Sequence, residues 1–115
     1  GLRFFRLEEE MNVVSLKEEE SKTLIERAEL LIAFLNEKTG RRFPARNPRG
    51  SPTANADLVM ARLREGYTAQ DCRSVVMLKV RQWLHDERMV KFLRPETLFR
   101  RSNFEGYLGE LGDVE

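Results

Sequence analysis

Apolar residues recur every three to four positions over most of the chain, which is the spacing of one face of an α-helix. The clearest stripe lies within residues 21–39, where it consists of Leu24, Ile25, Ala28, Leu31, Ile32 and Leu35. Gly40 follows the stripe and suits the left-handed conformation that ends many helices. We therefore predict a first long helix over residues 21–39.

Capping signals mark the starts of further helices. Thr53 or Asn55 precedes a second apolar stripe, and Gly66 follows it. Thr68-Ala-Gln-Asp71 has the form of a capping box, with Asp in place of the usual Glu. Ser102 is placed to cap the last helix. The predicted helices are residues 56–65, Thr68 to about His85, and shorter ones over 87–93, 95–99 and 103–111.

The segment Arg94-Pro95-Glu96-Thr97-Leu98-Phe99 is the corner around which the short helices are arranged. Pro95 cannot continue a helix but suits the first helical position. Large apolar side chains gather here, namely Trp83, Phe92, Leu93, Leu98, Phe99 and Phe104. We interpret the corner first as a core anchor and second as a docking surface. With no β-α-β alternation, we predict an all-α fold, a compact bundle of about five to six helices, over residues 21–115.

Residues 1–20 fit no single pattern. Phe4, Leu7, Met11 and Val14 follow helical spacing, yet residues 13–16 also fit a short strand. The chain begins without Met, and we interpret residues 1–20 as an adapter or linker segment to an upstream domain missing from this sequence. Self-association through this segment is a further, weaker hypothesis.

Composition is that of a folded, helix-rich domain. Of 115 residues, 41% are hydrophobic and 34% are charged, which distinguishes the chain from a disordered one. The single Cys72 excludes an internal disulfide and suits a reducing cytosol. No apolar run is long enough for a transmembrane helix, so we expect no membrane partner.

The net charge of +1 hides a local basic patch. Residues 41–50 hold four arginines and no acid, in a loop interrupted by three prolines up to Pro52. Guanidinium groups match phosphate geometry, and an exposed Phe43 ring can stack on an unpaired base. The pattern predicts nucleic-acid contact through Arg41, Arg42, Phe43, Arg46 and Arg49. The alternatives are a solvated loop and a Phe43 that fills the core behind Gly40.

Two cations interrupt the apolar stripes of the predicted helices. Lys79 lies among Val75, Val76 and Trp83, and Arg62 has a similar position on the second helix. An unpaired buried charge is costly, so we predict that both lay their stems on the core and pair internally. The candidate partners are Asp71, Asp86 and Glu96, and Trp83 is within reach of Lys79 for a cation–π contact. The alternative is contact with a phosphate or a partner.

Catalytic chemistry is not indicated. His85 is the only histidine, and with Cys72 it supplies too few ligands for a metal site of histidine and cysteine. Cys72 lies on an apolar stripe, which favours an inert thiol. We expect no enzyme activity, no cofactor and no metal.

Several blocks, taken in order, resemble the conserved phage C-terminal domain of phage and prophage replication proteins of the replisome-organiser type. They are Leu35–Phe43, Ala61–Thr68, Lys79-x-x-x-Trp83, Phe92–Phe99 and Phe104–Leu108. The resemblance covers about residues 30–108. It implies a module that follows a winged-helix DNA binder, acts at a phage origin in the bacterial cytoplasm, and helps to recruit the host replicative helicase or its loader.

Our leading hypothesis combines both lines of reasoning. The chain would be a non-enzymatic module of a phage-type replication initiation protein, with DNA, single-stranded DNA included, as its partner. The Arg-rich loop would contact DNA together with Arg94, Arg100 and Arg101. The alternative is a module that docks the helicase or loader through Trp83, Phe92, Leu98 and Phe99.

Overall fold

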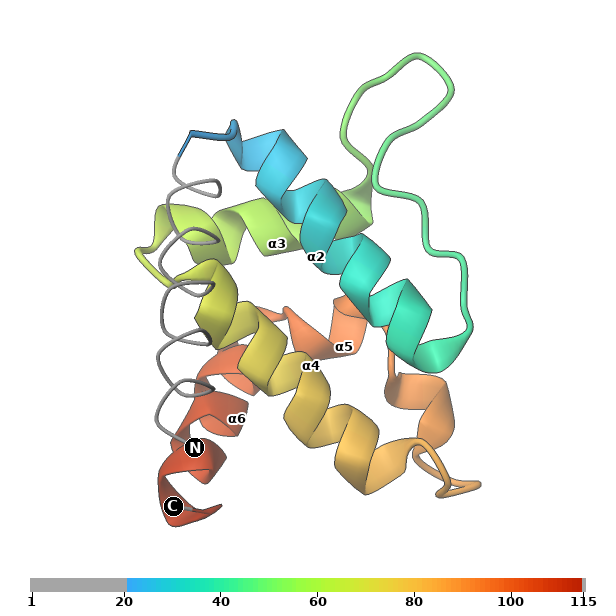
Figure 1. The fold of residues 1–115 in the computed structure, drawn as a ribbon, viewed down its shortest axis with the longest axis vertical. Coiled ribbons are helices and arrows are strands. Elements are labelled where there is room, and N and C mark those ends of the chain that lie inside the picture. Colours follow the sequence, from blue (N-terminus) through green and yellow to red (C-terminus); the bar gives the residue numbers. More distant parts are fainter. Residues whose placement is uncertain (1–20, 115) are drawn as a thin grey trace, which may run out of the picture.

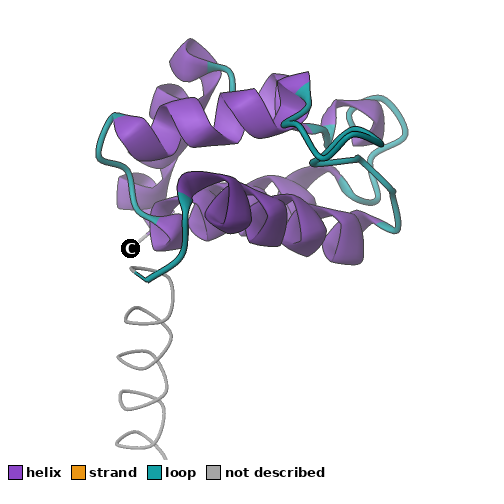
Figure 2. Cartoon of the chain, turned by 90° about the horizontal axis from the view of Figure 1, so that it is seen from above, coloured by secondary structure: helices purple, strands orange, loops and turns teal. Residues whose placement is uncertain are grey.

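The computed structural model describes residues 21–114, which form an all-α domain without strands (Figures 1 and 2). Its elements are α2 (Leu24–Thr39), α3 (Ala54–Arg64), α4 (Ala69–Trp83), the 3₁₀-helix η1 (Val90–Phe92), α5 (Pro95–Leu98) and α6 (Arg101–Val114). The predicted fold class is therefore confirmed. The adapter and self-association predictions for residues 1–20 lie outside the described residues.

Local capping defines the three long helices. The Thr23 and Thr53 hydroxyls accept hydrogen bonds from backbone N–H groups in the first turns of α2 and α3. Thr68 and Asp71 form the predicted capping box at the start of α4, with bonds of 3.0 and 2.9 Å. Gly40 ends α2 in the left-handed region, at φ 72°. The signals predicted at Thr53, at Thr68 with Asp71 and at Gly40 are confirmed, because each acts within a few residues of its own helix end. The Thr23 cap was not predicted, and α2 begins at Leu24 rather than at residue 21.

The second half of the chain departs from the prediction. In place of a helix over residues 87–93, Asp86 Oδ1 accepts bonds from the N–H groups of Arg88 and Met89, at 2.9 and 3.1 Å. This side-chain competition leaves a turn and only a short 3₁₀ segment. The last helix begins at Arg101, before the predicted cap Ser102, which therefore lies inside it. Both local predictions were wrong.

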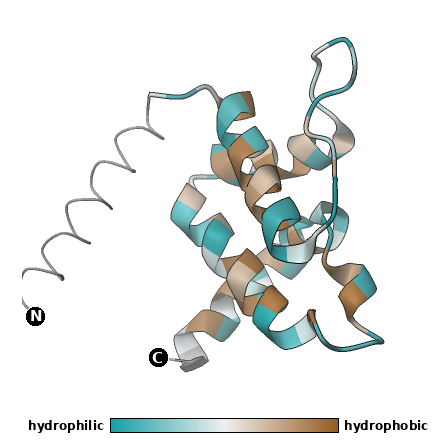
Figure 3. Cartoon of the chain, turned by 45° about the vertical axis from the view of Figure 1, so that its right-hand side comes forward, coloured by the Kyte–Doolittle hydropathy of each residue, from teal (hydrophilic) through white to brown (hydrophobic). Residues whose placement is uncertain are grey.

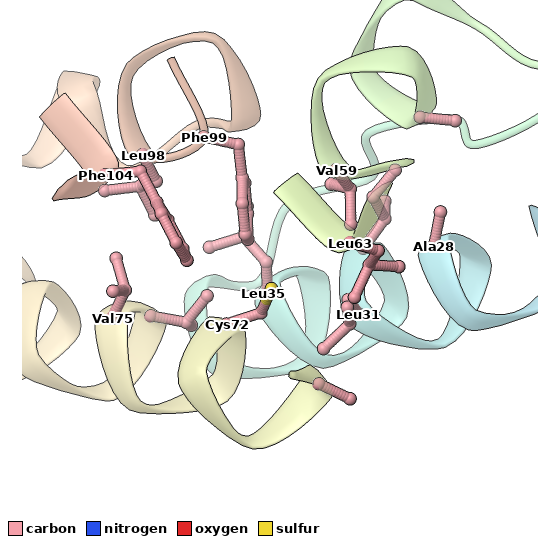
Figure 4. Packing of buried hydrophobic residues seen from close by; sticks show 14 of the residues in the cluster. Ala28, Leu31, Leu35, Val59, Leu63, Cys72, Val75, Leu98, Phe99 and Phe104 are labelled. Carbon is pink, nitrogen blue, oxygen red and sulfur yellow. The ribbon is translucent and has the colours of Figure 1, made fainter. Parts of the chain in front are cut away.

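The helices pack around one apolar core in two layers (Figure 2). α2 packs on α3 and α4, α3 packs on α5, and α4 packs on α6. Phe99 and Phe104 stack with centroids 5.8 Å apart, and both are fully buried. Figure 4 shows them pointing from the α5–α6 corner toward Cys72 and Leu35. The corner is thus a core anchor, as its aromatic content predicted.

Candidate functional site

The loop between α2 and α3 projects from the bundle as its most polar segment (Figures 1 and 3). Its first residues are nevertheless fixed on α2. The Asn36 amide donates to the Phe43 carbonyl at 3.0 Å, and the Phe43 N–H donates to Asn36 Oδ1 at 2.9 Å. The Phe43 ring is half-buried against the core. The ring therefore fills the core edge, which limits its use as a stacking platform.

Arg41 connects this loop to η1. Its Nη2 donates to the Val90 carbonyl at 3.2 Å, a contact across 49 residues of sequence. The bond holds the start of the loop beside Lys91 and Phe92. Arg41 thus has a structural role that the sequence pattern did not reveal. Its bond fixes the adjacent loop residues relative to η1.

Arg46 is paired within the domain. Its Nη2 lies 2.9 Å from Glu29 Oε1 on α2, and its Nη1 donates to the Gly50 carbonyl at 3.0 Å. The hydrogen bond from Arg46 lowers the pKa of the Glu29 carboxyl below its ordinary value. The charge of Arg46 is therefore largely offset before any phosphate approaches.

Arg42 and Arg49 are the two loop arginines that remain available. Both are exposed, and within residues 21–114 neither guanidinium has a hydrogen bond or an ion pair. The Asn47 Oδ1 atom accepts the N–H groups of Arg49 and Ser51, at 2.9 and 3.0 Å, and so orders the loop tip. Two free cations on an ordered loop are suited to contact an anion.

A second basic and aromatic group lies at η1. Lys91 Nζ is 5.3 Å from the centroid of the half-buried Phe92 ring, and Arg94 Cζ is 5.6 Å from it. Arg94 also donates to Thr97 at 3.0 Å, and its Nη1 is 4.0 Å from Glu96. Lys91 was missed by the sequence analysis, although its position next to Phe92 was a usable signal. We call Arg42, Arg49, Lys91, Phe92 and Arg94 the basic face.

Arg101 does not join this face. Its Nε lies 3.4 Å from Glu65 and 3.9 Å from Glu105. Glu65 follows the C-terminal end of α3, whereas the loop enters α3 at its N-terminal end, about 16 Å away along the helix. Arg100 is 3.9 Å from Glu96. Both arginines are exposed, but nearby carboxylates oppose their charges, and Glu96 opposes the charge of Arg94 on the basic face in the same way.

The two buried cations have internal partners, as predicted, and Lys79 makes the predicted cation–π contact with Trp83, but their carboxylates are not the predicted ones. Arg62 Nη1 donates to the Phe99 carbonyl at 2.9 Å, and its Nε lies 2.6 Å from Glu65. Lys79 Nζ lies 2.9 Å from both Gln82 and Glu110. It also lies 4.8 and 4.1 Å from the ring centroids of Trp83 and Tyr107.

The three carboxylates predicted as partners are used elsewhere. Asp71 belongs to the capping box of α4, and Asp86 caps the turn that follows it. Glu96 lies on the exposed side of α5, near Arg94 and Arg100. These roles are set by short sequence separations, so none of the three carboxylates reaches the buried cations.

The predicted docking surface is reduced by burial. Leu98 and Phe99 are fully buried, so they offer no surface to a partner in this fold. Trp83 is half-buried, with its ring 5.9 Å from Tyr107 in an edge-to-face contact. Of the four predicted docking residues, only Phe92 and Trp83 keep exposed area, and both rings already contact cations of the domain.

The residues with catalytic potential are not brought together. Burial raises the pKa of the Cys72 thiol to about 12, whereas His85 is exposed beyond the end of α4. Within residues 21–114, no three histidine, cysteine or acidic side chains cluster to hold a metal ion. The same residues contain no helix long and apolar enough to cross a membrane.

The chain is similar to a known protein family. The family model described as "Conserved phage C-terminus" matches residues 31–109. No curated protein and no solved structure matches the chain significantly. The matched range includes α3, α4, the basic face and both buried cations.

Proposed function

Because the chain belongs to the conserved phage C-terminus family, we propose that it is a non-enzymatic module of a phage replication initiation protein that contacts DNA. The observation that supports this proposal is the basic face, in which exposed Lys91 and half-buried Arg94 lie beside the Phe92 ring while Arg42 and Arg49 are exposed on the loop. Arg41 holds the start of the loop at η1 through the Val90 carbonyl. This bond brings the start of the loop, with the neighbouring Arg42, to η1, whereas Arg49 extends further away at the loop tip.

The chemistry of this face favours phosphate contact over base recognition. Arg42 and Arg49 have guanidinium groups free of carboxylate partners, and a guanidinium binds phosphate with two parallel hydrogen bonds. Phe92 is partly covered by Lys91 and Arg94, so a base would contact only its remaining exposed part. We therefore expect binding with weak sequence preference and a strong dependence on salt.

The test is fluorescence anisotropy of labelled single-stranded and double-stranded DNA over a series of salt concentrations. The Arg42→Gln/Arg49→Gln double variant should bind more weakly. Its salt slope for single strands should be shallower by about 1.4, since each lost phosphate contact removes about 0.7. Neither guanidinium supports the fold, so the melting temperature should stay unchanged.

Arg64→Gln is a matched control, because Arg64 is exposed at the end of α3 opposite to the loop. It also removes one positive charge, so a general effect of net charge would appear in this variant. If the double variant kept the affinity and salt slope of the original chain, DNA contact through the basic face would be refuted.

A further inference from the structure

A groove between α2, α4 and α6 is lined by apolar and basic side chains. Its volume is about 330 Å³, and its lining residues are Phe34, Gln70, Arg73, Ser74, Met77, Leu78, Arg81 and Leu111. No carboxylate is among them. One turn before Phe34, Leu30 is 50% exposed. The groove is thus a small hollow that combines apolar and basic side chains.

The charged side chains that line the groove are positive. Arg73 and Arg81 line it, and Lys38 Nζ lies 5.3 Å from the centroid of the Phe34 ring. An occupant should therefore combine apolar side chains with carboxylates. Residues 1–20 have this composition: six glutamates against three basic residues, a net charge of −3, with Phe4, Leu7, Met11 and Val14 at helical spacing.

The connection between this segment and α2 places it within reach. Residues 21 and 22 join it to the cap Thr23, and Phe34 lies about 16 Å further along α2. A segment of 20 residues spans about 30 Å even when it is helical. A helical return alongside α2 would bring Met11 about level with Phe34 and Leu7 about one turn further along α2. Covalent attachment also gives the segment a high effective concentration, which a separate partner lacks.

We propose that residues 1–20 dock on this groove, with apolar side chains on Phe34, Met77 and Leu111 and with glutamates facing Arg73, Arg81 and Lys38. The groove is then an intramolecular docking site that holds the N-terminal segment against the bundle. This inference is independent of the DNA-binding proposal, because it uses none of the residues of the basic face.

The experiment is amide hydrogen exchange of the full chain, followed by mass spectrometry of fragments that cover residues 1–20. We expect exchange slowed by about tenfold or more relative to an unstructured peptide, at a rate independent of protein concentration. Met77→Glu should return the segment to near-free exchange. Met89→Glu, the same change on the turn after α4, should leave the protection intact.

A second variant keeps the test valid if Met77→Glu unfolds the domain. Arg81 is exposed, so Arg81→Glu should loosen the segment with the melting temperature unchanged. Changing Glu8, Glu9 and Glu10 to Lys in that background should restore protection. Free exchange in the original chain would overturn the proposal. So would protection that rises with concentration together with a dimeric mass, since the occupant would then be a second copy.

Discussion

Replacing Lys79 by Met tests whether this cation holds α4 to α6. Lys79 is 3% exposed, and its ammonium group lies 2.9 Å from Glu110 on α6. The ammonium also lies over the rings of Trp83 and Tyr107. Met retains most of the stem that packs on the core, so the substitution removes mainly the charge.

The size of the effect follows from these contacts. The charged hydrogen bonds are worth about 1 kcal/mol once solvent screening of the 43% exposed Glu110 side chain is allowed for. The two cation–π contacts add about 1–2 kcal/mol. Relief from burying an ammonium group offsets part of this loss. We therefore expect Lys79→Met to lower the free energy of unfolding by about 1–2 kcal/mol.

Removing Glu110, the other partner of the ion pair, should lower the free energy of unfolding further than removing Lys79. Glu110→Ala leaves the cation buried with only Gln82 and the rings, whereas Lys79→Met leaves a carboxylate that water can reach. We expect about 2–3 kcal/mol for Glu110→Ala, because an uncompensated charge is most costly where it is buried. Whether Glu110→Ala is less stable to unfolding than Lys79→Met therefore tests the argument independently of the absolute free energies.

The assay is urea unfolding, followed by the fluorescence of Trp83, the only tryptophan of the chain, and by circular dichroism. The slope of free energy against urea should stay constant if only stability changes. A loss below about 0.3 kcal/mol for Lys79→Met would refute the structural role. Weakened DNA binding in the same variant would then identify Lys79 as a ligand contact.

Three further predictions concern single side chains. Burial holds the pKa of the Cys72 thiol at about 12, so alkylation at pH 8 should follow the rate of unfolding, and rapid labelling of the folded chain would contradict this. Gly40→Ala should cost about 1 kcal/mol in urea unfolding because Gly40 has φ 72°, whereas Gly106→Ala inside α6 should be neutral or stabilising. The hydrogen bond to Glu105 raises the pKa of Tyr67 above 10. The stability that this bond contributes is therefore complete below pH 10 and is lost as pH rises through the pKa of the folded state. Absorbance at 295 nm should show a smaller rise of this pKa in Glu105→Gln, which loses the carboxylate charge while burial and Glu65 still act.

The sequence was informative where structure depends on neighbouring residues. The capping box at Thr68 and the left-handed Gly40 formed as predicted, since each bond joins groups at most four residues apart. Ser102 shows the limit of this reasoning. It has the residue type of a cap, but the Phe104 N–H donates to the Arg100 carbonyl at 2.8 Å, so helical bonding has already begun before Ser102.

The partners of the charged residues could not be predicted in the same way. Lys79 pairs with a residue 31 positions away, and Arg62 bonds to a carbonyl 37 positions away. With 19 acidic residues in the chain, the sequence cannot show which carboxylate the fold brings close. The same limit applies to the loop, where Arg46 pairs with Glu29 on α2 while the Arg42 guanidinium has no ion pair among residues 21–114.

The end of α2 links the two proposed surfaces. Lys38 contacts Phe34 at the groove, and two residues before it Asn36 fixes the start of the Arg-rich loop. Glutamates docked near Lys38 would oppose the approach of phosphate to the start of the loop, an electrostatic effect that salt screens. Releasing residues 1–20 should then strengthen DNA binding. Met77→Gln weakens the apolar part of the groove without adding charge. This variant should therefore bind DNA more tightly than the original chain at low salt, and the difference should vanish at high salt. Equal affinity at every salt concentration would mean that the two surfaces act independently.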